Sequence, residues 1–71
     1  MYLLTSSELY IKKIENITRS IKLGNKKPID VASEISGYFE KLKPLNPMMG
    51  EDLMDKYKKE VANWNLKNEK N

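Results

Sequence analysis

Few side chains in this sequence could take part in catalysis. The chain contains no histidine and no cysteine, so it lacks the commonest general base, the thiolate nucleophile and the imidazole and thiolate metal ligands. Its three glycines, at positions 24, 37 and 50, are isolated, so no phosphate-binding GxxxxGK[ST] loop is present. No pattern among the remaining carboxylates, serines, lysines and tyrosines pairs a nucleophile with a base. We therefore expect no catalytic residue and no cofactor, and we expect that the protein is not an enzyme.

The densest group of carboxylates is formed by Glu51, Asp52 and Asp55. Carboxylate oxygens are the ligands that divalent cations such as Mg²⁺ and Ca²⁺ prefer. The same residues, however, crowd the expected start of a helix, where the helix dipole favours negative charge. We interpret them as the acidic beginning of that helix and expect no metal site.

The basic side chains suggest one class of ligand. The chain has 13 basic and 10 acidic residues, a net charge of +3 and a pI of about 9.2. Lysines can neutralise phosphates without reading base sequence, so nucleic acid is a candidate partner. Arginine, the usual reader of guanine, occurs only at Arg19, and Ala32 and Gly37 do not have the spacing of a helix-turn-helix. This alternative therefore depends on a patch of lysines, namely Lys12, Lys13, Lys22, Lys26 and Lys27.

Two adjacent methionines, Met48 and Met49, lie in a connection between helical segments. The pair could form the first turn of a helix and cover the core beneath Leu45 and Phe39, because methionine fills irregular gaps. Alternatively, the pair is exposed and belongs to an interface with another protein or a second copy. In that case we expect it to act with aromatic and aliphatic anchors. The candidate interface consists of Met48, Met49, Trp64, Tyr57 and Ile29.

A first helix is predicted over residues 5–23. Thr5 and Glu8 have the spacing of a capping box, and Leu4 and Leu9 the spacing of a hydrophobic staple. Gly24 suits the left-handed residue that ends the helix. At about 100° per residue, one apolar stripe forms along the helix, and it contains Tyr10, Ile11, Ile14, Ile17, Thr18 and Ile21.

A second helix is predicted over residues 28–43, with Pro28 at its first position and Pro44 as its stop. Gly37 lies inside it at a cost of about 1 kcal/mol relative to alanine. Close approach of another backbone would account for this glycine. The predicted apolar face consists of Val31, Ala32, Ile35, Tyr38, Phe39 and Leu42.

A third helix is predicted over residues 47–67, beginning either at Pro47 with Asn46 as N-cap or after Gly50. Residues 67–71 are expected to form a frayed tail. The predicted apolar face consists of Leu53, Met54, Tyr57, Val61 and Trp64.

These segments predict an all-α fold in one domain, residues 1–71, built as a small bundle of three amphipathic helices with short loops. A chain of 71 residues buries only a marginal core. Without a disulfide or a metal, dimerisation could complete that core. The spacing of Tyr10, Ile14, Ile17 and Ile21 also permits pairing with a second copy, so a homodimer stays open.

The apolar residues outside the three stripes indicate a function. They include Leu3, Ile29 and Leu66, and together with the methionine pair they exceed what so small a monomer can readily bury. We expect a small helical protein-interaction module, an adaptor, inhibitor or regulator, that binds a partner protein with an acidic surface through an apolar helix face. No apolar run is long enough for a membrane span and no secretory signal is present, so we expect a cytoplasmic protein. The richness in lysine and asparagine indicates a low-GC bacterium, its phage or a mobile element.

Overall fold

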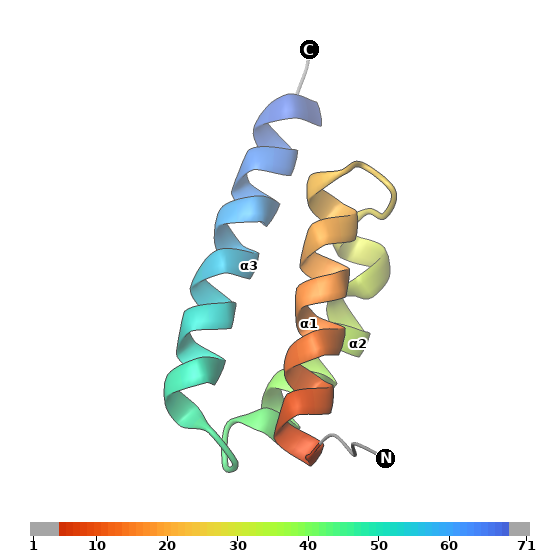
Figure 1. The fold of residues 1–71 in the computed structure, drawn as a ribbon. Coiled ribbons are helices and arrows are strands. Elements are labelled where there is room, and N and C mark those ends of the chain that lie inside the picture. The colour runs from red at the N-terminus through yellow and green to blue at the C-terminus, as the bar shows by residue number, and fades with distance from the viewer. Residues whose placement is uncertain (1–4, 69–71) are drawn as a thin grey trace.

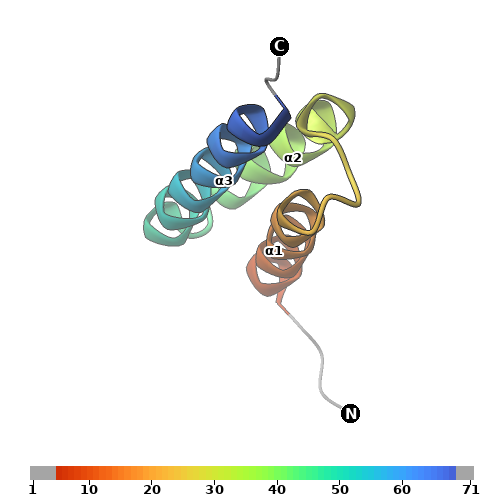
Figure 2. The same ribbon diagram turned by 90° about the horizontal axis from the view of Figure 1, so that it is seen from above.

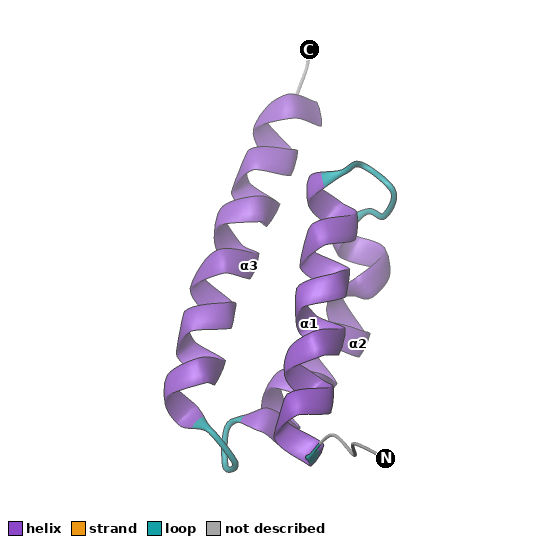
Figure 3. Cartoon of the chain, viewed as in Figure 1, coloured by secondary structure: helices purple, strands orange, loops and turns teal. Residues whose placement is uncertain are grey.

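The computed structural model describes residues 5–68, which form three helices joined by two short loops (Figure 1). Helix α1 spans Ser6–Lys22, α2 spans Pro28–Leu42 and α3 spans Pro47–Asn68. Helix α2 runs antiparallel to α1, and α3 runs parallel to α1. Within the described residues, only the two loops and Thr5 are non-helical (Figure 3). Seen from above, the helices occupy the corners of a triangle (Figure 2), and each helix contacts both others. The predicted all-α three-helix bundle is confirmed.

Both ends of α1 have the predicted caps. The Glu8 amide donates to Thr5 Oγ1 at 3.2 Å and the Thr5 amide donates to Glu8 Oε1 at 2.9 Å, which completes the capping box. Gly24 has a φ of 83°, the left-handed conformation that terminates a helix. The predicted staple is not described, because Leu4 lies outside the described residues.

Helix α2 begins at a buried proline, Pro28, and its N-cap residue Lys27 makes no side-chain capping hydrogen bond. Two expectations for this helix were wrong. No atom lies within 4 Å of a Cβ placed on Gly37, because Gly37 is about 200° around the helix from both Ile35 and Phe39 and faces no other backbone. Ala32 is exposed because it lies at the edge of the stripe that the other helices cover.

Helix α3 begins at Pro47 rather than after Gly50. The Met49 amide donates to Asn46 Oδ1 at 3.2 Å and the Gly50 amide donates to Asn46 O at 3.0 Å, so Asn46 is the N-cap. The helix continues to Asn68, whose Nδ2 donates to Trp64 O at 2.8 Å. Residues 67 and 68, expected in a frayed tail, therefore form the last helical turn, whereas 69–71 lie outside the described part of the chain.

The three helices contribute unequally to the core. Helix α3 supplies only one fully buried large side chain, Leu53, whereas Met54, Tyr57 and Trp64 are half-buried and pack against the core edge. The Phe39 and Tyr57 rings, 6.0 Å apart between centroids, join α2 to α3. The eight buried hydrophobic residues are Ile14, Ile17, Ile21, Val31, Ile35, Phe39, Leu42 and Leu53.

Replacing Gly37 with alanine should stabilise the protein. The new methyl group meets no neighbour and alanine is favoured in a helix interior, so we expect the free energy of unfolding to rise by about 1 kcal/mol. Thermal unfolding followed by far-UV circular dichroism measures this change. Gly24→Ala is the matched control: the same change at a φ of 83° should destabilise the fold. A lower melting temperature for Gly37→Ala would show that a neighbour does approach this position.

Thr5→Ala should cost about 1 kcal/mol of stability, because it removes the acceptor for the Glu8 amide. Thr5→Ser retains a hydroxyl and should unfold close to the wild-type denaturant concentration. Urea unfolding of the three proteins tests this. Equal stability of the alanine variant would mean that the capping box adds nothing to the bundle.

Candidate functional site

Among residues 5–68, no group of three acidic side chains is placed to hold a metal ion. Because α3 begins at Pro47, Glu51, Asp52 and Asp55 lie beyond its first turn, where the dipole acts most strongly. They are exposed along the helix. The same stretch of chain contains no helix long and apolar enough to cross a membrane.

The methionine pair is divided between core and surface. Met49 is half-buried and packs against the core, as in the first interpretation. Met48 is 80% exposed and follows Leu45, which is 54% exposed, at the α2–α3 loop. Met49 therefore packs on the core and Met48 is exposed, and an interface at Met48 stays a prediction.

The five residues of the candidate interface do not form one surface. Sixteen residues of helix separate Met48 from Trp64, a distance of about 24 Å along α3. Ile29, 81% exposed, lies in the first turn of α2, at the same end of the bundle as the C-terminal part of α3 (Figure 1). Tyr57 lies between the two ends and contacts Phe39. A partner at one end would therefore contact only part of the predicted set.

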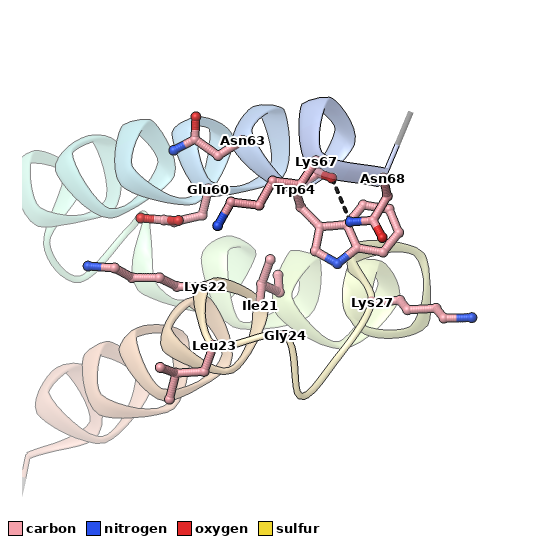
Figure 4. Close-up of a pocket in the computed structure, with 10 residues that line it drawn as sticks. All are labelled: Ile21, Lys22, Leu23, Gly24, Lys27, Glu60, Asn63, Trp64, Lys67 and Asn68. Atoms are coloured by element: carbon pink, nitrogen blue, oxygen red, sulfur yellow. Dashed lines mark hydrogen bonds between the residues drawn. The ribbon is translucent and has the colours of Figure 1, made fainter. Parts of the chain in front are cut away.

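The end of the bundle near Trp64 contains a hollow of about 320 Å³. It lies between the C-terminal end of α1 with the following loop and the C-terminal part of α3, and we call it the Trp64 hollow (Figure 4). Its apolar lining comes from Ile21, Leu23 and Trp64. Ile21 belongs to the core, Trp64 is half-buried and Leu23 is 66% exposed. The hollow therefore presents apolar surface that this chain leaves partly uncovered.

Apart from Gly24, the rest of the lining of the Trp64 hollow is polar, and its three lysines outnumber its one carboxylate. Lys22 and Lys67 extend to the same side of the indole as Glu60, whereas Lys27 extends to the other side (Figure 4). Asn63, Asn68 and Gly24 complete the lining, and the amide of Asn68 is held by its hydrogen bond to Trp64 O. This combination of an apolar floor and a basic rim suits a ligand with an apolar centre and negative flanks.

The five lysines of the predicted nucleic-acid patch do not lie together. Ten residues of α1 separate Lys12 from Lys22, about 15 Å along the helix. Lys13 Nζ lies 5.8 Å from the centre of the Tyr38 ring, between α1 and α2. Lys26 and Lys27 belong to the loop after α1, and only Lys22 and Lys27 line the Trp64 hollow. A single phosphate-binding surface made of all five is not present.

Of the lining residues, only Lys22, Lys27 and Trp64 belong to the predicted sites, and Leu23 and Lys67 are among those that were missed. Leu23 falls outside the apolar stripe of the first helix and directly precedes the glycine that ends it. The sequence did contain one signal for Leu23: it is a large apolar residue beside a turn, and it belongs to no helical stripe. Lys67 was assigned to the tail, because no pattern indicated that α3 continues through Asn68.

Comparisons with protein-family models, with curated proteins and with solved structures found no match.

Proposed function

We propose that this protein is a small, non-enzymatic protein-interaction module, an adaptor, inhibitor or regulator, that binds a partner protein through the Trp64 hollow. One observation carries the proposal: a half-buried tryptophan and an exposed leucine share a hollow of about 320 Å³. Binding energy at protein interfaces concentrates on aromatic anchors and on apolar side chains that fill pockets. A partner side chain in this hollow would contact Leu23 and Trp64, whereas Ile21 beneath them is buried in the core.

The opposite end of the bundle supports binding less well. Met48 is 80% exposed and Leu45 is 54% exposed there, but Met48 does not line the Trp64 hollow and has no tryptophan beside it. Isolated exposed apolar residues are common on protein surfaces. We therefore assign the partner to the Trp64 end. A cytoplasmic location and an origin in a low-GC bacterium, phage or mobile element belong to the same proposal.

The alternative function is that of a lysine-rich nucleic-acid-binding accessory protein or transcriptional regulator. Its support is the net charge of +3, and its weakness is the spread of the five lysines along the bundle. Binding to a DNA duplex that falls steeply with salt and ignores changes at Leu23 would favour this alternative.

Selection of random twelve-residue peptides on the immobilised full chain tests the proposed function. Attachment through the N-terminus keeps the support away from the Trp64 hollow, since α1 starts at the other end of the bundle (Figure 1). We expect enriched peptides to bind the Leu23→Ser variant at least tenfold more weakly, because Leu23 supplies exposed apolar surface to the hollow.

Met48→Ser is the matched control, since it removes an exposed apolar side chain at the other end of α3. Peptide binding to this variant should equal that of the wild type. Sensitivity to Met48→Ser without sensitivity to Leu23→Ser would move the interface to the other end. A library that yields no enriched peptide would count against the interaction module itself.

A further inference from the structure

We propose that the segment recognised by the Trp64 hollow is acidic, with one large apolar side chain flanked by carboxylates. This inference rests on the proposed function and specifies the chemistry of the partner. The apolar side chain would enter beside Trp64 and Leu23, and the carboxylates would meet the lysines of the rim. A hollow of about 320 Å³ is at the small end of ligand sites, so it suits one anchor side chain rather than a broad surface.

The charge of the lining favours an acidic segment. Three lysines, Lys22, Lys27 and Lys67, line the hollow against one carboxylate, Glu60, which leaves an excess of two positive charges. In Figure 4 these lysines extend to both sides of the indole. Carboxylates placed before and after the anchor would each find a lysine. Opposite charges of this kind raise the association rate and set the orientation of the bound segment.

The position of Lys27 gives independent support. Lys27 is the N-cap residue of α2, with φ −92° and ψ 142°, and it makes no side-chain capping hydrogen bond. Aspartate, asparagine, serine and threonine stabilise this position, and a positive charge is unfavourable at a helix N-terminus. Lys22 and Lys67 lie in the last turns of α1 and α3, where lysine complements the helix dipole. The helix dipole does not explain a lysine at position 27, whereas contact with an acidic partner would explain it.

The composition of the selected peptides is the first test. We expect the enriched sequences to contain Leu, Ile, Met or Phe with Asp or Glu on both sides. Synthetic peptides of these sequences without tryptophan can then be titrated against the protein, because Trp64 is its only tryptophan. Burial of the indole beside the anchor should shift its emission to shorter wavelength, and replacing the anchor with alanine should abolish the shift.

Charge removal in the hollow is the second test. At about 0.1 M salt, the triple variant Lys22→Gln, Lys27→Gln and Lys67→Gln should bind the selected peptides about tenfold more weakly, from three exposed pairs of modest strength. The matched control is Lys12→Gln, Lys41→Gln and Lys43→Gln, which removes the same charge from exposed positions that do not line the hollow. The control should bind within about twofold of wild type, since remote charges are largely screened.

Lys27→Asp separates binding from folding. An aspartate at the N-cap should raise the melting temperature, by about 4–8 °C if it caps well. The same variant should bind the acidic peptides more weakly than wild type. A variant that is more stable and yet binds less well cannot owe its loss to misfolding. Unchanged or tighter binding by Lys27→Asp would overturn the role given to this lysine.

The outcomes distinguish the inference from the proposed function. Enriched peptides that are neutral or basic, yet depend on Leu23, would overturn the acidic segment and leave the interaction module standing. If the hollow triple variant and its control lose the same affinity for the peptides, the loss follows from net charge alone, and the inference is overturned as well. If light scattering shows a dimer that Leu23→Ser dissociates, the occupant is a second copy of this chain and the acidic partner is excluded.

Discussion

The stripe of Ile14, Ile17 and Ile21 along α1 is the feature on which the rest of the bundle depends. These three side chains are almost fully buried, and α1 packs against both other helices. Besides Pro28, helix α2 adds four buried side chains to this stripe, whereas α3 adds one large side chain, Leu53. Helix α1 is therefore central to the bundle and packs against both other helices, while the buried side chains come mainly from α1 and α2. This inequality follows from the small number of apolar residues that a short chain can place inside.

The unequal core explains where the candidate site lies. Beyond Leu53, α3 continues for fifteen residues to Asn68 without another fully buried side chain. Its contact with the rest of the bundle there includes half-buried aromatic rings, of which Trp64 is the last. The space between this part of α3 and the end of α1 is filled only partly, and the Trp64 hollow is the remainder. A larger domain would cover this surface with its own chain, whereas here it stays partly uncovered.

The helices were predictable because their signals are local. Thr5 with Glu8, Gly24, Pro28 and Asn46 each act on backbone within a few residues, and all appear in the structure as expected. Errors arose where one helix had to be placed against another. The freedom around Gly37, the exposure of Ala32 and the division of Met48 from Met49 all depend on which face of a helix a neighbour covers. The Trp64 hollow joins residues 21–27 to residues 60–68, and periodicity within single helices cannot show such a pairing.

The connections between the helices also bear on how the chain folds. Residues 23–27 and 43–46 are the only links, so helices that follow each other in the sequence are neighbours in space. Contacts between such neighbours close short loops, and proteins of this low contact order fold in microseconds to milliseconds. The capping box gives α1 a defined start early in the process, and α2 can dock on its isoleucines before α3 is complete. The contacts of α3 with α1 close a longer loop that contains all of α2, so we expect α3 to be the last helix to join the bundle.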